Sequence, residues 1–123
     1  MNIVDSSGWL AYFADERNAK HFLSPLNDAA SLVVPTVTIY EVFKVVLRES
    51  NENKALQAVV AMQRGVVADL TVPLSIAASK LSLEYNLPMA DSIILATAKE
   101  FNADLWTQDP DFENIPGVKY FPR

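Results

Sequence analysis

The chain has 123 residues and is 50% hydrophobic, so it is long enough to bury a substantial core, and disorder is not expected. It contains no cysteine, which excludes disulfides and thiolate metal sites. The net charge of −5 argues against binding nucleic acid through a broad basic surface. It does not argue against a metal-assisted nuclease, whose acidic residues bind cations.

The start of the chain has neither a basic segment nor a long apolar run, so no signal peptide is expected. No apolar stretch approaches the ~20 residues that a membrane-spanning helix needs. We therefore expect one domain over residues 1–123, soluble and cytoplasmic, with no membrane contact.

In the first part of the chain, short apolar segments alternate with helical patterns. The patterns predict, in chain order, a strand at 1–5, helices at 9–14 and 15–25, a strand at 31–34 and a helix at 36–50. Asp15 and Glu16 are expected in the first turn of the second helix, where acids interact favourably with the helix dipole. The strand at 31–34 is continuously apolar, which is typical of strands buried on both faces.

The second part continues the alternation after a polar break at residues 51–53. Gly65 is expected to end a helix. The patterns then predict a strand at 66–70, helices at 74–85 and 90–101, and strands at 103–107 and 118–121. Strands that alternate with helices indicate an α/β fold with a mostly parallel sheet flanked by helices.

The helix predicted at 90–101 is apolar or small on almost every side, so it is expected inside the fold, packed against the sheet. Asp91 is the one charge in its first turn. A carboxylate there either caps the helix or points into a cleft and holds a cation.

Four carboxylates fall where an open α/β sheet binds its ligands, beyond the carboxyl ends of the strands. Asp5 ends the first strand, and Asp109 follows the strand at 103–107. Glu41 lies near the start of the helix after the second strand, and Asp91 near the start of the buried helix. Structural roles are also open, because Asp5 can cap the next helix and Asp109, before a proline, can form an Asx-turn.

Glu41 has two interpretations of its own. With Thr38 it has the spacing of a capping box. It also shares a helical line with Val37 and Val45, which predicts that it faces inward. A buried lone carboxylate is costly unless it is paired or bound to metal, and an ion pair with Lys44 would be worth only tenths of a kcal/mol.

Convergence of these acids would explain all four positions at once. Two charges ~4 Å apart interact by about 4 kcal/mol at an effective dielectric of 20, so such a cluster requires protonation or a divalent cation. Oxygen ligands suit Mg²⁺ or Mn²⁺ rather than zinc. The chemistry that these ions support is hydrolysis of a phosphodiester.

With these acids, the chain resembles a PIN-domain ribonuclease. Its size is similar to that of the VapC-like toxin of a toxin–antitoxin pair. The matching segments occur in the family's order and span the chain: residues 4–7, 35–42, 90–98 and 105–112. Ser92 departs from the alanine common at that position of the motif, but it is also small.

The resemblance implies an α/β/α sandwich, Mg²⁺- or Mn²⁺-dependent RNA cleavage, a homodimer and an antitoxin that blocks the site. By motif, it implies that the catalytic and metal-binding residues are Asp5, Glu41, Asp91 and Asp109. It further implies that Ser7 and Thr107 are supporting hydroxyls, and that Asp111 is a supporting acid.

Other function classes fit less well. A receiver-like signalling domain needs two adjacent acids after its first strand, but Ser6 follows Asp5. An aspartyl phosphotransferase needs a second aspartate where Ser7 stands. The single histidine, His21, is expected on the surface, so a histidine-based triad is not supported. A non-catalytic RNA-binding or interaction module of the same fold remains the main alternative.

Overall fold

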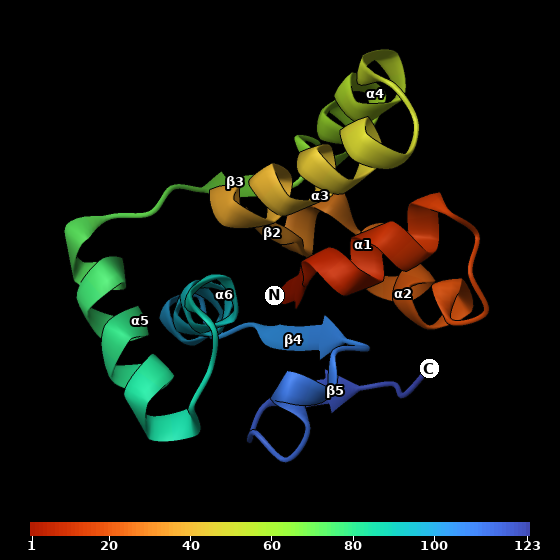
Figure 1. Cartoon of the computed structure of the whole chain (residues 1–123). Coiled ribbons are helices and arrows are strands. Elements are labelled where there is room, and N and C mark those ends of the chain that lie inside the picture. The colour runs from red at the N-terminus through yellow and green to blue at the C-terminus, as the bar shows by residue number, and fades with distance from the viewer.

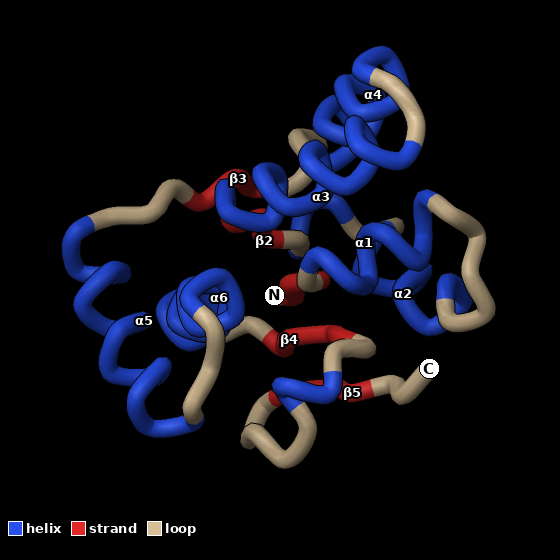
Figure 2. The backbone as a smooth tube through the Cα atoms, viewed as in Figure 1, coloured by secondary structure: helices blue, strands red, loops and turns tan.

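The computed structural model describes all residues, 1–123, as a parallel β-structure surrounded by helices (Figures 1 and 2). The strands are β1 (Asn2–Val4), β2 (Val33–Pro35), β3 (Val66–Ala68), β4 (Asp104–Thr107) and β5 (Val118–Tyr120). The helices are α1 (Ser6–Phe13), α2 (Ala19–Leu26), α3 (Thr36–Glu49), α4 (Glu52–Met62), α5 (Val72–Tyr85) and α6 (Met89–Glu100). Two short 3₁₀ helices are η1 (Ala29–Ser31) and η2 (Pro110–Phe112).

Every strand pair is parallel. One sheet has the order β1-β4-β5, the other pairs β2 with β3, and a single bridge between Asn2 and Leu32 links the two. In register, Ile3 lies opposite Leu105 and Val34 opposite Val67. The predicted α/β fold with a mostly parallel sheet is confirmed.

Strands β1 and β2 are buried on both faces, and their successive residues point to opposite sides. Ile3 and Val33 pack into the core that α5 and α6 cover, whereas Val4 and Val34 pack into the core covered by α1 to α4. This arrangement is the predicted α/β/α sandwich. Continuous apolar strands are what such double burial requires.

Helix α6 lies between α5 and the strands, as the sequence predicts (Figure 1). Every residue from Ser92 to Ala98 is buried. None of the helices has the length and hydropathy of a membrane-spanning segment.

Several helix boundaries follow from local sequence. The Asn51 side chain accepts a 2.8 Å hydrogen bond from the amide of Lys54 and caps α4. Thr71 caps α5 in the same way. Gly65 lies beyond the end of α4, where a Cβ atom would come within 2.8 Å of the Leu32 carbonyl oxygen. It therefore permits close approach of the chain to the residue before β2.

One boundary prediction is wrong, and one of the two interpretations of Glu41 is excluded. Asp15 and Glu16 do not open α2, which begins at Ala19; Asp15 takes a left-handed conformation with φ 51° in the preceding turn. The capping box of Thr38 and Glu41 does not form either. Helix α3 begins at Thr36, so Thr38 lies inside the first turn, where its buried hydroxyl has no partner.

Candidate active site

The four predicted acids line one open cleft of about 970 Å³. Asp5 follows β1, Glu41 belongs to α3, Asp91 lies in the first turn of α6, and Asp109 follows β4. Because parallel strands carry the chain to the same sheet edge each time, residues more than 100 positions apart meet there.

Asp5 is almost completely buried, with 2% of its surface exposed. Its carboxylate accepts hydrogen bonds from the Ser7 hydroxyl at 2.7 Å, the Gly8 amide at 3.0 Å and the Thr107 hydroxyl at 2.7 Å. Asp5 therefore caps α1 and lines the cleft at the same time. Burial raises the pKa of Asp5 to about 6, although the three hydrogen bonds act in the opposite direction.

Asp91 does not cap its helix. The residue at the cap position is Pro88, and no side chain caps the helix there. Burial raises the pKa of Asp91 to about 8, and the charges of the neighbouring acids, Asp109 first, add to the shift. A half-buried carboxylate with this pKa favours a proton or a cation as its partner.

Glu41 is half-buried and faces the cleft together with Val45, one turn later. The Ser6 hydroxyl donates a hydrogen bond to Glu41 Oε1 and so joins α1 to α3. Lys44 does not pair with Glu41; its ammonium group lies 5.7 Å from the centre of the Tyr40 ring.

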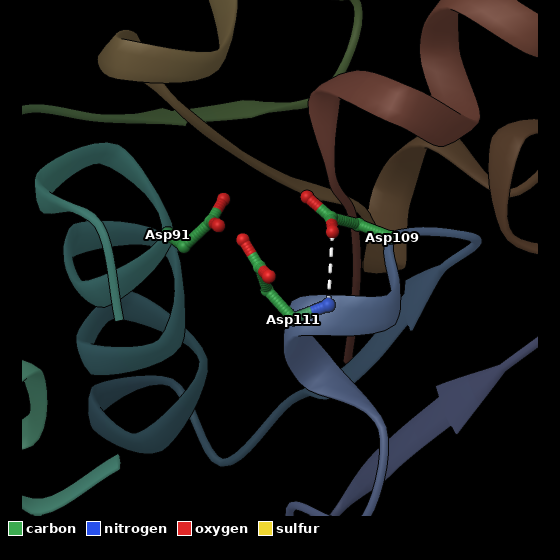
Figure 3. Close-up of side chains that lie close together, drawn as sticks. All are labelled: Asp91, Asp109 and Asp111. Carbon is green, nitrogen blue, oxygen red and sulfur yellow. Dashed lines mark hydrogen bonds between the residues drawn. The ribbon is translucent and has the colours of Figure 1, made fainter. Parts of the chain in front are cut away.

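Asp109 also has two roles. Its Oδ1 accepts a 2.9 Å hydrogen bond from the Asp111 amide, so the Asx-turn is formed and opens η2. Figure 3 shows that this turn directs Asp111 toward Asp91 and Asp109. One carboxylate oxygen from each of these three residues lies within 4.8 Å of the others.

Asp111, which the resemblance implied as a supporting acid, thus lies within the most compact group of acids, while Asp5 and Glu41 lie outside that group.

No basic side chain neutralises any of these five acids. The two ion pairs of the structure, Arg48–Glu49 and Lys119–Asp104, lie elsewhere. The donor set is entirely oxygen and anionic, which fits Mg²⁺ or Mn²⁺ and does not fit a soft-metal site.

The two predicted hydroxyl residues lie between the acids. Thr107 donates to Asp5 and accepts a 2.9 Å hydrogen bond from the Asp109 amide. Ser7 donates to Asp5 and accepts from the Gln108 amide at 3.3 Å. These contacts fix the orientations of Asp5 and of the chain that carries Asp109.

Sequence reasoning missed three polar residues of this region. Ser6 orients Glu41, and Gln108, 2% exposed, donates to the Ser7 carbonyl oxygen at 3.2 Å. Asn18, 8% exposed, donates to Gln108 Oε1 at 3.2 Å. Gln108 directly follows β4 and Ser6 lies two residues after β1, and this proximity to strand ends is the signal that could have identified them. Nothing in the local sequence marks Asn18.

His21 does not line the cleft. It is half-buried and stacks on Phe121 with a ring-centre distance of 4.7 Å.

The sequence and the fold are similar to those of known proteins. Residues 3–118 match the sequence model of the PIN domain. No curated protein sequence matches the chain.

Solved structures share the fold over nearly the whole chain. A toxin–antitoxin complex from Klebsiella pneumoniae superposes with a TM-score of 0.84 at 24% identity and covers 100% of both chains. VapC20 of Mycobacterium tuberculosis, described as a sarcin-ricin loop cleaving toxin, has a TM-score of 0.77 at 16% identity, covering 94% of this chain and 95% of its own. DNA-bound VapBC of Salmonella typhimurium has a TM-score of 0.76 at 15% identity, with 99% and 98% covered.

Proposed function

This chain belongs to the PIN domain family, a family of nucleases, and from that premise we propose that it is a metal-dependent endoribonuclease that hydrolyses RNA phosphodiester bonds. The observation that carries the proposal is the gathering of Asp5, Glu41, Asp91 and Asp109 in one cleft with no basic partner. Four carboxylates this close together repel one another unless a cation is bound between them, so their proximity supports a cation-binding site.

We assign these four acids as the ligands of Mg²⁺ or Mn²⁺, with Asp111 assisting from the exposed side. When bound, such a cation stabilises negative charge on a phosphate and lowers the pKa of an attacking water. The protein contributes rigidity. Asp5 is held by three donors and Glu41 by Ser6, so both carboxylates are in place before substrate arrives.

We further propose that the protein is the toxin of a toxin–antitoxin pair, acts in the cytoplasm, and forms a homodimer that a small antitoxin inhibits. The support is the similarity of fold to a Klebsiella toxin–antitoxin complex and to a VapBC complex from Salmonella. The sarcin-ricin loop specificity of VapC20 is not transferred to this chain at 16% identity, and the substrate class that we propose is single-stranded or loop RNA. Light scattering of the purified protein should give twice the monomer mass.

The test of the nuclease is cleavage of a labelled single-stranded RNA by the purified protein. Cleavage should require Mg²⁺ or Mn²⁺, stop in excess chelator and return when Mn²⁺ is restored. Full activity in chelator would contradict the metal mechanism. Absence of cleavage with either ion would favour a non-catalytic RNA-binding module of the same fold.

A further inference from the structure

Most of the charged side chains that line the cleft are acidic. Besides the four acids of the site, Glu16 and Glu49 line it, and the only basic side chains along it are Lys54 and Arg123. An RNA strand must bring its phosphates into this negative field. Cations on the protein are therefore needed where the strand leaves the metal-binding acids.

Arg123 lies on a segment that is held firmly against the site. Asn18 Nδ2 donates to the carbonyl oxygens of Phe121 and Pro122, both at 3.1 Å. The Phe121 amide donates to the Thr107 carbonyl oxygen at 2.9 Å. The chain beyond β5 thus runs along the end of β4, beside the position of Asp109.

Aromatic stacking fixes the same segment from both sides. The Phe121 ring stacks on His21 at 4.7 Å and 9°, and on Trp106 at 5.9 Å and 20°. Asn18 also bonds to the buried Gln108, which contacts Ser7. One continuous set of contacts therefore connects the residues around Asp5 with the segment that carries Arg123.

The Arg123 side chain is exposed and takes part in neither ion pair of the structure. A guanidinium group offers five N–H donors in a planar fork that matches the oxygens of a phosphate. An unpaired arginine on a fixed segment beside an acidic cleft has the chemistry of a phosphate anchor.

We infer that Arg123 binds a backbone phosphate of the RNA lying in the cleft, and that Asn18 is the positioning residue that holds the Arg123 segment there. This inference rests on the proposed ribonuclease function and assigns a substrate contact to it. The contact is made to the sugar–phosphate backbone, so it supports binding of any sequence.

The experiment compares Arg123→Ala with wild type in cleavage of a labelled single-stranded RNA of mixed sequence in Mn²⁺. KM should rise about tenfold while kcat stays close to wild type, because the acids are untouched. The slope of log KM against log salt should become smaller by about 0.7, the value for one phosphate contact to a single strand. Lys20→Ala, the same loss of charge on α2 outside the cleft, should change neither quantity.

Arg123→Lys should keep the salt slope and recover part of the lost affinity. Asn18→Ala should raise KM as well, and its effect should not add to that of Arg123→Ala, because both act on one contact. Melting curves of the variants identify any general loss of folding.

The outcomes separate the two proposals. An Arg123→Ala enzyme with wild-type KM and an unchanged salt slope overturns the phosphate contact but leaves the ribonuclease intact. A fall in kcat with KM and slope unchanged also overturns it. Failure of the wild-type protein to cleave RNA with either metal overturns the proposed function itself.

Discussion

The Thr107 hydroxyl donates a 2.7 Å hydrogen bond to Asp5 Oδ2 and joins the end of β4 to the end of β1. The hydroxyl oxygen of Thr107 also accepts a 2.9 Å hydrogen bond from the Asp109 amide. One buried hydroxyl therefore sets the spacing between two acids that the sequence separates by more than 100 residues. Loss of this group should affect both the site and the stability of the fold.

Thr107→Val removes the hydroxyl and keeps the shape. It leaves the buried Asp5 carboxylate with one donor fewer and the Asp109 amide without its acceptor, which should lower the free energy of unfolding by about 1–3 kcal/mol. RNA cleavage should fall by about 10- to 100-fold, as for other residues that orient metal ligands. Chemical unfolding and cleavage assays measure the two effects.

Thr97→Val is the matched control. Thr97 is equally buried, but its hydroxyl donates to the Ile93 carbonyl within α6, away from the acids. Its cleavage rate should stay close to wild type. Equal losses of activity in both variants would mean that Thr107 acts only through general stability.

Asp91→Asn removes the acid whose pKa is raised to about 8. Cleavage should fall by orders of magnitude if Asp91 is a metal ligand, and Mg²⁺ should raise the melting temperature less than in wild type because its affinity is lower. Without metal at about pH 8, the variant should melt at a higher temperature than wild type, since the repulsion from Asp109 is gone. Below about pH 4 the two should melt alike, because Asp91 of the wild type is then protonated in both the folded and the unfolded state.

The comparison is made with melting curves of both proteins, recorded once in chelator and once in excess Mg²⁺ without chelator. A variant that cuts RNA normally and gains as much from Mg²⁺ as wild type would overturn the assignment of Asp91.

The stability of the metal-free protein should depend on pH in a direction opposite to that of most acidic groups. The folded-state pKa values of Asp5 and Asp91, about 6 and about 8, lie above the ordinary value of 3.8. Between about pH 4 and 8 the folded protein therefore binds more protons than the unfolded chain, so the free energy of unfolding falls as pH rises. Below about pH 4 both states are protonated at these groups and the effect ends.

Melting temperatures measured in chelator should accordingly decrease from about pH 5 to about pH 8. Added Mg²⁺ should reduce this decrease, because metal affinity increases as the ligands lose their protons. A metal-free melting temperature that stays constant or rises across this range would show that the acids are better solvated than their burial implies.

Glu41→Gln separates charge from hydrogen bonding. The Ser6 hydroxyl can still donate to the amide oxygen of the new side chain, so the melting temperature should change little. Loss of the negative charge should weaken metal binding and lower cleavage by at least about tenfold. Glu84→Gln, the same change on the exposed face of α5, should leave cleavage unaltered, and wild-type activity in Glu41→Gln would return Glu41 to a structural role.

The fold could be predicted because its hydrophobic pattern is strong. The apolar residues of α6 and of β2 have no polar face, so they could only be internal. Asp5 and Asp109 could be identified because they lie one and two residues after strands, and a parallel sheet places such residues at one edge. Their function as metal ligands stays a prediction.

The features that could not be predicted from the sequence, the start of α2 and the position of Asp111, depend on tertiary contacts and on the conformation of a turn. Helix α2 begins at Ala19 and not at residue 15 as predicted. Asn18, at the cap position of α2, bonds to Gln108 and to the chain after β5, and the local sequence does not indicate these contacts. The position of Asp111 depends on the conformation of the Asx-turn at Asp109, which a dipeptide pattern indicates but does not orient.

The pairing of β1 with β4 has a consequence for synthesis on the ribosome. Asn2 lies opposite Asp104, so the first strand emerges early but meets this neighbour only after nearly all of the chain has been made. Until residue 109 has been translated, no fragment contains all four acids. The proposed metal site therefore cannot assemble on any shorter nascent chain, and RNA cleavage by the proposed ribonuclease is expected only after Asp109 has been made.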